Sequence, residues 1–281
     1  MSAPGLWITY NSLIIASMIQ ENSSLNHKYG PWAMVAGASE GIGAAFAKSL
    51  AKSGFNLVLL ARRPGMLKSL ADEIERAFTV KIECLAFDLQ NWNKLTKLVS
   101  DLNQDIGLLV YNAAYSPIGN LEEIPESDLI KAIDVNVKSP LLLIKTLIPS
   151  MIARKKGGII LMSSLSGAQG SPRIATYAAT KSFNTILAEG LWKELGQKGI
   201  DVMVCCAGAV RTPGYLRSKS GKDAPGTLDP ADIAESALSA LGKGPVNVPG
   251  FTNKMARFVM GRLLPRKTTI NIMYTNTKDL K

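Results

Sequence analysis

A tyrosine and a lysine four residues apart could together transfer a proton. Tyr177 and Lys181 stand in the run YAATK, a spacing that places both side chains on one face of a helix. An ammonium group beside a phenol stabilises the phenolate, so this tyrosine could exchange a proton with a carbonyl or alcohol oxygen near neutral pH. Such pairs also occur on ordinary exposed helix faces, and the surrounding sequence must decide between the two interpretations.

A serine upstream favours the catalytic interpretation. Ser164 lies thirteen residues before Tyr177, at the end of an apolar run in LMSSLSG. His27 is the only histidine and stands outside any cluster of carboxylates or cysteines. A Ser-His-Asp triad and a histidine metal site are therefore excluded, and no metal is expected. Instead, Ser164 is predicted to donate a hydrogen bond to the oxygen of a substrate carbonyl.

A glycine-rich turn, AGASEGIG, could bind the phosphates of a cofactor. Gly37, Gly41 and Gly43 separate an apolar run from a helix-period run. At such a turn the backbone N–H groups and the helix N-terminus point at an anion, normally the pyrophosphate of a dinucleotide. The turn alone is weak evidence, because many strand-to-helix turns contain glycine.

The end of the next apolar run indicates which dinucleotide is bound. A carboxylate there would bind the ribose diol of NAD, but LLARR places Arg62 at this point. Arg62 can pair with a 2′-phosphate and Ser39 could add a hydroxyl, whereas Glu40 is an unfavourable neighbour for that phosphate. We therefore expect NADP (NADPH) as the cofactor. Two solvated arginines at a strand end are the alternative.

The elements that must position these residues alternate along the chain. Near-continuous apolar runs predict strands that are covered on both faces, and helix-period stretches lie between them. Strict alternation means parallel strands joined by right-handed crossovers. We predict an α/β fold, a Rossmann-like doubly wound parallel sheet of about seven strands in a single domain. Strands are expected at 32–36, 56–61, 80–86, 107–111, 158–163, 200–206 and 246–248, and helices at 42–53, 64–78, 91–103, 126–153, 174–197 and 230–241.

Seven ordered motifs make the chain resemble the short-chain dehydrogenase/reductase superfamily from about residue 32 to residue 248. They are GASEGIG, FDL, YNAA, DVNV, SS, YAATK and AGAVRT. The resemblance implies that Ser164, Tyr177, Lys181 and Asn136 are catalytic, with Asn136 kinking its helix to hold a water in a proton relay. It also implies a cofactor-binding set, which consists of Gly37, Ser39, Glu40, Gly41, Ile42, Gly43, Arg62, Asp88, Leu89, Asn112, Ala113, Tyr177, Lys181, Gly208, Val210 and Thr212.

The resemblance further implies an NADP(H)-dependent oxidoreductase that reduces a hydrophobic or lipidic ketone or aldehyde to an alcohol, or runs in reverse. Two other classes remain open: a non-catalytic NADP-binding redox sensor of the same fold, and a lyase or epimerase with a bound nicotinamide cofactor. Residues 212–229 are expected to form a substrate lid. The predicted walls of the substrate pocket are Tyr115, Ile118, Gly119, Ala168, Gln169 and Tyr215.

The positive charge of the chain is concentrated at its end. The net charge is +10, and after Gly242 there are eight Lys and Arg residues against one acidic residue. Met255, Phe258, Val259 and Leu263 fall near one helical face, a pattern typical of a peripheral membrane helix. Packing against the substrate cleft or against a second subunit is the alternative. Nucleic acid is not an expected partner, because no recognised binding module accompanies the basic residues.

Three segments are expected: residues 1–30 as an extension that is helical, 31–250 as the catalytic domain and 251–281 as a basic extension. The apolar run at 6–19 is too short to span a bilayer, and a surface helix, a poorly ordered start and a targeting segment all remain open. The three cysteines lack CxxC spacing, which fits reduced thiols in a cytoplasmic protein, peripheral at a membrane in one interpretation. The apolar helices 126–153 and 174–197 could form a homodimer face.

Overall fold

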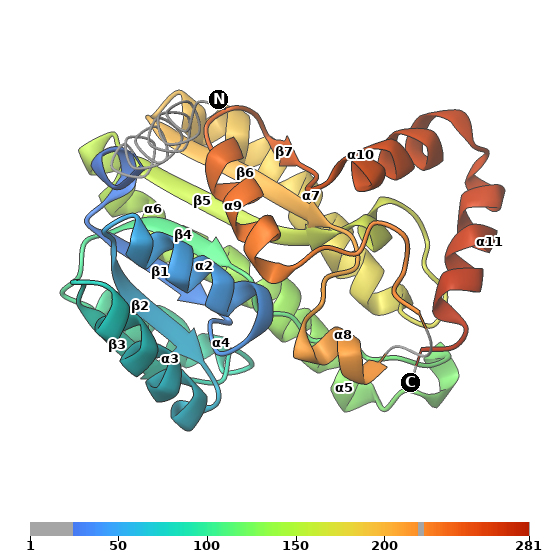
Figure 1. Cartoon of the computed structure of the whole chain (residues 1–281), viewed down its shortest axis with the longest axis horizontal. Coiled ribbons are helices and arrows are strands. Elements are labelled where there is room, and N and C mark those ends of the chain that lie inside the picture. Colours follow the sequence, from blue (N-terminus) through green and yellow to red (C-terminus); the bar gives the residue numbers. More distant parts are fainter. Residues whose placement is uncertain (1–24, 219–221, 281) are drawn as a thin grey trace, which may run out of the picture.

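The apolar runs of the chain form the strands of one parallel sheet. The computed structural model describes residues 25–218 and 222–280 (Figure 1). The sheet has seven strands in the order β3-β2-β1-β4-β5-β6-β7, and each neighbouring pair is parallel. The predicted doubly wound fold is confirmed. The strands are β1 (Trp32–Ala36), β2 (Asn56–Ala61), β3 (Ile82–Ala86), β4 (Ile106–Tyr111), β5 (Gly157–Ser164), β6 (Ile200–Ala207) and β7 (Val246–Asn247).

Helices cover both faces of the sheet (Figure 1). On one face lie α2 (Gly41–Lys52), α3 (Pro64–Ala77) and α9 (Pro230–Ala240). On the other lie α4 (Trp92–Ser100), α6 (Ser139–Arg154) and α7 (Ala175–Gly196). The chain runs from β1 to β3 in one direction and from β4 to β7 in the other, so the carboxyl ends of β1 and β4 enclose the crevice where doubly wound folds bind ligands.

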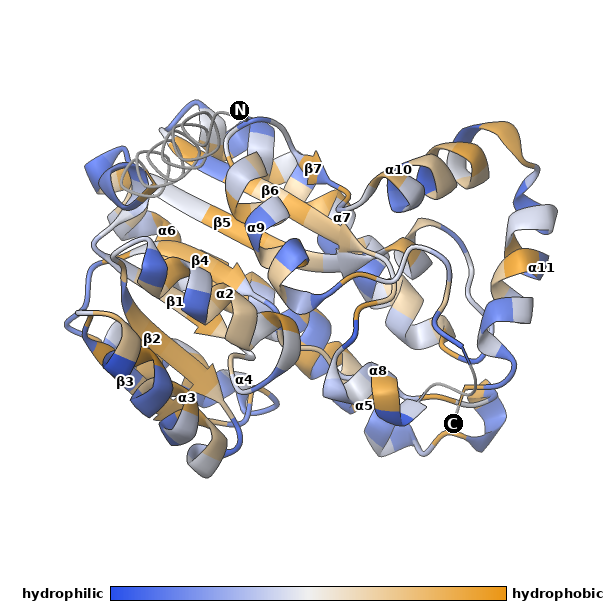
Figure 2. Cartoon of the chain, in the orientation of Figure 1, coloured by the Kyte–Doolittle hydropathy of each residue, from blue (hydrophilic) through white to orange (hydrophobic). Residues whose placement is uncertain are grey.

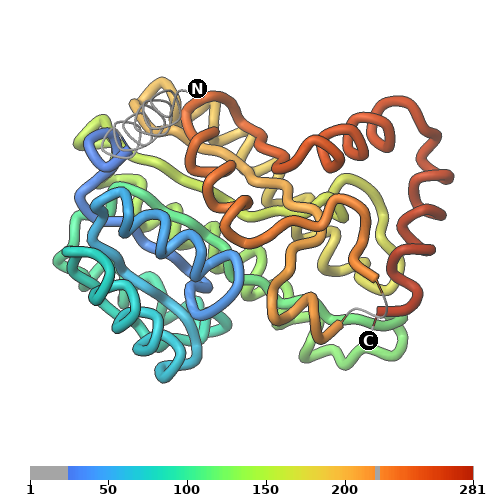
Figure 3. Tube along the Cα trace, in the orientation of Figure 1, coloured from blue at the N-terminus to red at the C-terminus, as the bar shows by residue number. Residues whose placement is uncertain are grey.

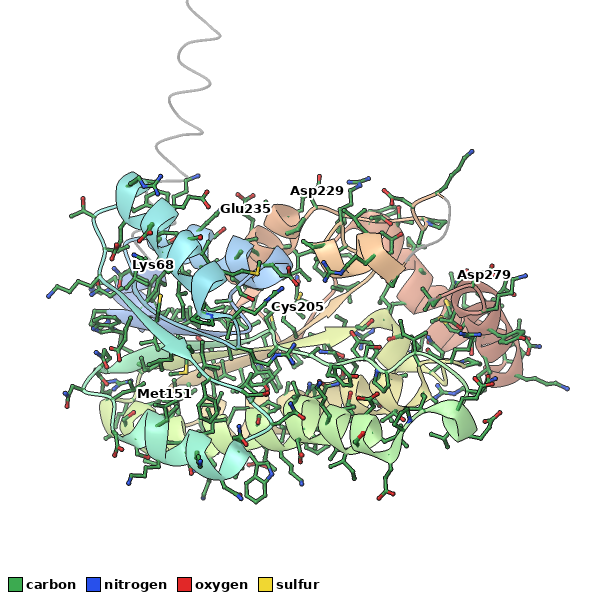
Figure 4. All side chains as sticks on the ribbon, turned by 90° about the horizontal axis from the view of Figure 1, so that it is seen from below. Lys68, Met151, Cys205, Asp229, Glu235 and Asp279 are labelled. Atoms are coloured by element: carbon green, nitrogen blue, oxygen red, sulfur yellow. The ribbon has the colours of Figure 1, made fainter. Side chains whose placement is uncertain are left out.

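Burial on both faces explains why the strands are almost continuously apolar. Along β1, Met34 and Val35 point to opposite faces and are both fully buried. Cys205 and Met151 lie on opposite sides of the sheet, each packed among helices (Figure 4). Cys205 and its neighbour Cys206 are both buried.

The helix expected at 126–153 is interrupted. The structure has α5 (Glu126–Ile133), a π-helical turn η2 (Asp134–Lys138) and then α6. Together these segments are long and apolar enough to cross a membrane by length and composition alone. However, the apolar side chains of α6, such as Leu143 and Met151, are buried against the sheet, as in the core helix of a globular domain.

The chain leaves the sheet after β7 as a C-terminal arm, which we define as residues 251–280 (Figure 3). The single helical face predicted through Leu263 is wrong in detail: α10 (Phe251–Phe258) passes into a π-helical turn, η4 (Val259–Leu263). The helix then stops before Pro265, and α11 (Arg266–Thr277) follows. The arm returns to the body, where the Arg266 side chain donates to the Ala168 carbonyl at 2.8 Å. The predictions for residues 1–24 lie outside the described residues.

One buried side chain anchors the arm at its start. Asn253, 3% exposed, lies on α10. Its Nδ2 donates to the carbonyls of Gly226 and Pro249, both at 3.0 Å. On its other side the amide fills the space beside Gly208, where a Cβ would lie 2.6 Å from the Asn253 Oδ1. The arm is thus packed directly on the loop that follows β6.

Candidate active site

Close backbone packing explains the glycines after β1. Gly37 has a φ of 83°, and a Cβ there would lie 2.5 Å from the backbone nitrogen of Ala113. A Cβ at Gly43 would lie 2.0 Å from the Gly37 carbonyl oxygen, which also accepts a hydrogen bond of 2.9 Å from the Asn112 side chain. The N-terminus of α2 is therefore bare backbone at the mouth of the turn, and this cradle fits a pyrophosphate.

The turn borders a cleft of about 290 Å³ at the carboxyl ends of β1, β2 and β4. Eleven of the predicted cofactor residues line it: Gly37, Ser39, Glu40, Gly41, Ile42, Arg62, Asp88, Leu89, Asn112, Ala113 and Thr212. Thr212 comes from a distant loop, and a Cβ at Gly41 would lie 2.8 Å from its Cγ2. The fold thus brings together five separate segments, 37–42, 62, 88–89, 112–113 and 212, each of which was predicted from the sequence.

Other predicted residues lie outside this cleft. Gly43 is packed beneath the turn, Gly208 faces Asn253, and Val210 forms a parallel bridge with Leu228. Tyr177 and Lys181 belong to a neighbouring cluster, described below. The cofactor contacts predicted for these five residues stay predictions.

Several lining residues were missed by the sequence analysis. Phe87 is the first residue of the FDL motif and Val135 the second of the DVNV motif, so membership of a motif could have identified them. Lys131 carries no such signal: its ammonium lies 4.2 Å from the centre of the Tyr115 ring, a cation–π contact that only the fold creates. The remaining missed residues are Ala61, Ala114 and Gly214, and Tyr115 had been assigned to the substrate pocket instead.

Two of the six expected substrate walls line hollows, and they line different ones. Tyr115 lines the cofactor-type cleft, whereas Ala168 lines a groove between α7 and the C-terminal arm. Tyr215 lies on α8 (Pro213–Ser218) within the predicted lid, where its hydroxyl accepts a 3.0 Å hydrogen bond from the Ala224 amide. Gly119 donates its backbone N–H to the Arg173 carbonyl at 2.9 Å.

A second arginine, not selected from the sequence, contacts the hydroxyl at the rim of the cleft. Arg63 donates to Ser39 Oγ at 3.1 Å and pairs with Glu40 at 3.0 Å. Arg217 approaches the same carboxylate at 3.6 Å. Glu40 is therefore balanced by two guanidinium groups, which removes the unfavourable charge that the sequence suggested for this loop. Arg62 lines the cleft itself.

The proton-transfer residues meet at the carboxyl end of β5. Ser164 is its last residue, and its Oγ accepts hydrogen bonds from the Ser166 amide at 3.2 Å and from Ser166 Oγ at 3.0 Å. Lys181 is buried on α7, with its Nζ donating to the Met162 carbonyl at 2.9 Å and lying 5.4 Å from the centre of the Tyr177 ring. The predicted i,i+4 pair does share one face, and that face is turned towards the strand end.

The pKa values of the pair differ from the sequence expectation. Burial raises the pKa of Tyr177 to about 12, while a hydrogen bond with Ser164 acts to lower it. Burial lowers the pKa of Lys181 to about 8, against a smaller raising effect from Cys206. The prediction that Lys181 lowers the Tyr177 pKa is therefore not reproduced, because desolvation of the phenol dominates and Ser164 is the opposing group.

Asn136 lies at the kink of the long helix, in the π-helical turn η2. Its fully buried amide accepts a hydrogen bond from the Tyr115 backbone N–H and donates one to the Tyr115 carbonyl, both at 2.8 Å. It also donates to Thr180 Oγ1 at 3.0 Å. Single π-helical turns of this kind are frequent at functional sites. Asn136 thus links the wall of the cleft to α7, three residues from Tyr177.

Comparison with known proteins decides the family. A family model described as short chain dehydrogenase matches residues 31–222. This chain belongs to the short chain dehydrogenase family. As a member of this family it is an oxidoreductase that uses a nicotinamide dinucleotide, NAD or NADP, and the predicted family is confirmed.

Among its relatives are two lipid-modifying enzymes. The chain is 30% identical to a 7beta-hydroxysteroid dehydrogenase of Clostridium sardiniense over 82% of its own length and 90% of the relative. It is 32% identical to a very-long-chain 3-oxoacyl-CoA reductase of Phaeosphaeria nodorum over 86% and 74% of the two chains.

Solved structures agree with the fold. A 7beta-hydroxysteroid dehydrogenase structure superposes with a TM-score of 0.83 at 28% identity, covering 89% of this chain and 98% of the other. A short-chain dehydrogenase from Sphingobium yanoikuyae in complex with NADPH has a TM-score of 0.72 at 27% identity, covering 79% and 89%.

Proposed function

We propose that this short chain dehydrogenase is an NADPH-dependent reductase of a hydrophobic ketone or aldehyde. The observation that carries the proposal is the cluster of Ser164, Tyr177 and Lys181 together with the cleft lined by the glycine turn and Arg62. When bound there, NADPH would supply a hydride to the carbonyl carbon.

The chain's own residues would supply the proton and the polarisation. With its pKa raised to about 12, Tyr177 is protonated at neutral pH and can donate its phenolic proton to the carbonyl oxygen. Ser164 accepts two hydrogen bonds from Ser166, so its own hydroxyl proton can be donated to Tyr177 or to the substrate oxygen. A protonated Lys181 would stabilise the phenolate left behind.

The choice of NADPH over NADH rests on the rim of the cleft. No carboxylate follows β2; Ala61 and Arg62 stand there, and Arg63 already binds the Ser39 hydroxyl. These groups can surround a phosphate dianion with two guanidiniums and a hydroxyl. The NADPH complex of the related short-chain dehydrogenase gives further support.

The substrate class rests on the relatives together with the lining. A hydroxysteroid dehydrogenase and a very-long-chain 3-oxoacyl-CoA reductase both act on bulky, largely apolar molecules, as their names state. In this chain the aromatic rings of Tyr115 and Tyr215 offer apolar surface to such a molecule.

Net oxidation of NADPH is the deciding test. The full chain is incubated with an oxosteroid, a 3-oxoacyl-CoA and a long-chain aldehyde, and the loss of NADPH absorbance and the alcohol product are measured, with NADH in a parallel series. Turnover with NADPH for at least one substrate supports the proposal. A redox sensor would bind NADPH without turnover, and a lyase or epimerase would form product without net NADPH consumption. Either result would exclude the proposed reductase activity in favour of that other class.

A further inference from the structure

The first helix of the C-terminal arm directs an apolar stripe away from the body. Phe251, Met255 and Phe258 follow the i, i+4, i+7 spacing of one helical face, and Phe251 is 79% and Phe258 54% exposed. Asn253 lies on the opposite face of α10, where it is buried against the body. The anchored side of the helix therefore fixes the stripe outward, and packing of the stripe on the substrate cleft does not occur in the structure.

The apolar surface continues beyond α10. Leu263, at the end of the π-helical turn, is also exposed. Figure 2 shows hydrophobic residues gathered at the far end of α10 and in the turn that leads to α11. Across a groove of about 480 Å³, Ile186 of α7 is a further exposed apolar residue facing the same hollow as Phe258. Such contiguous exposed apolar surface marks an interaction site.

Cations border this surface. Lys254, Arg257 and Arg262 line the groove beside Phe258, where Glu189 is the single acidic residue. The arm holds six Lys and Arg residues against Asp279 alone. None of the ion pairs found among the described residues involves one of these six cations. Arg266 donates to the Ala168 carbonyl of the body, so the cations that can meet a partner at this surface are Lys254, Arg257 and Arg262.

We propose that the outer face of α10 and η4 docks the enzyme on an anionic lipid bilayer. A helix at a membrane surface inserts an apolar stripe among the acyl chains, and adjacent cations bind the lipid headgroups. The apolar stripe of α10 and the cations beside it provide these two features. A second copy of the chain matches less well, because a two-fold contact sets the same patch against itself and would face cations with cations. The bilayer supplies the missing negative charge.

The groove beside the docking face lies close to the proposed catalytic residues. Gly167 and Ala168, only a few residues after Ser164, line the groove together with the cations of the arm. A bilayer bound to α10 and η4 would therefore lie beside the segment that follows Ser164 in the chain. The docking itself does not depend on the proposed reductase activity, and its test uses no substrate.

Vesicle co-sedimentation of the full chain tests the docking. Vesicles of phosphatidylcholine with and without phosphatidylserine are compared at low and high salt. Replacing Lys254, Arg257 and Arg262 by Gln is expected to weaken binding to the anionic vesicles about a hundredfold. The triple variant Phe251→Ser, Met255→Ser, Phe258→Ser is expected to weaken it at least about tenfold. Thermal unfolding of each variant verifies that the fold is intact.

Matched controls separate the arm from the rest of the surface. Lys52, Lys94 and Lys97 are exposed lysines of α2 and α4, and their replacement by Gln removes the same charge from another face. Leu121→Ser removes one apolar side chain that is 60% exposed and far along the chain from the arm. Both controls are expected to bind vesicles like the parent chain.

Three results would overturn the proposal. The first is a parent chain that stays in the supernatant under every condition. The second is that both arm variants sediment as well as the parent, which would mean that another segment, such as residues 1–24, carries the binding. The third is a dimer, seen by light scattering without vesicle binding, that the apolar variant converts to a monomer, which would make a second copy the occupant.

Discussion

One amide of Asn136 holds both backbone groups of Tyr115. Its Oδ1 accepts from the Tyr115 N–H and its Nδ2 donates to the Tyr115 carbonyl, each at 2.8 Å. The third hydrogen bond of the amide reaches Thr180 on α7. The wall of the cleft and the helix that carries Tyr177 are thus joined through a single buried side chain.

Asn136→Asp should therefore destabilise the fold. The carboxyl cannot donate to the Tyr115 carbonyl while it is ionised, and it places a charge at a fully buried position. We expect a loss of about 2–3 kcal/mol in the free energy of unfolding, measured by urea denaturation. Asn93→Asp, on the exposed start of α4, is the control and should change stability by less than about 0.5 kcal/mol. Equal effects in the two variants would contradict the structural role.

Tyr177→Phe should abolish turnover and leave cofactor binding intact. The ring keeps its packing but loses the phenolic proton, and loss of a general acid lowers turnover at least about a hundredfold. NADPH titration by fluorescence and the rate of NADPH oxidation measure the two properties separately. A variant with nearly normal turnover would show that the proton comes from another group.

The lowered pKa of Lys181 should appear in the pH dependence of stability. The pKa is about 8 in the fold and 10.5 at its ordinary value, so between these pH values the unfolded chain binds a proton that the folded chain does not. The free energy of unfolding should then rise by about 1 kcal/mol per pH unit between pH 8 and 10, relative to Lys181→Met. The raised pKa of Tyr177 contributes only above pH 10. Parallel pH profiles of the two proteins would mean that Lys181 is not desolvated.

The two arginines after β2 should determine cofactor preference. A charge-assisted pair with phosphate contributes about 1.5–3 kcal/mol, so Arg62→Ala should weaken NADPH binding roughly ten- to a hundredfold and leave NADH binding nearly unchanged. Arg63→Ala should have the same selectivity, because Arg63 orients the Ser39 hydroxyl. Calorimetric titration of both cofactors checks this. Equal losses for NADPH and NADH would contradict a 2′-phosphate site.

Two glycine substitutions should change the stability of the fold in opposite directions. Gly43→Ala places a Cβ 2.0 Å from the Gly37 carbonyl oxygen, which forces the turn apart, and we expect a loss of at least about 2 kcal/mol in stability together with weaker NADPH binding. Gly190→Ala, at an exposed position within α7 with no atom near the added carbon, should stabilise by about 0.5–1 kcal/mol. Thermal unfolding distinguishes them, and a neutral Gly43→Ala would remove the packing explanation for the motif.

The elements that were predicted well are those with a strong and simple pattern. Strands buried on both faces, such as β1 and β4, are continuous apolar runs, and their bounds agree with the structure to within a residue. The apolar period gave no sign of the π-helical turn at Asp134–Lys138, and only the family resemblance implied a kink at Asn136. The break between α10 and α11 in the C-terminal arm was not predicted for a related reason, because periodicity does not show where a helix is interrupted.

The site was predicted residue by residue, but its contacts were not. The motifs located the glycine turn, Ser164, Tyr177 and Lys181. The structure shows that Arg63, and not Arg62, donates to Ser39. This depends on the direction of each side chain at the end of β2, which the sequence does not reveal. The raised pKa of Tyr177 likewise depends on burial by segments distant in sequence.

Asn253 makes the start of the arm part of the packing behind the loop after β6. Its amide holds the carbonyl of Gly226, a residue in the left-handed region with a φ of 77°, and fills the space that Gly208 leaves open. A chain cut before residue 253 would therefore lose more than an appendage, since it would leave a void and two unpaired carbonyls behind the loop after β6. The inner side of α10 is therefore part of the packed body of the enzyme. Only residues on its outer side can be replaced without disturbing the loop after β6.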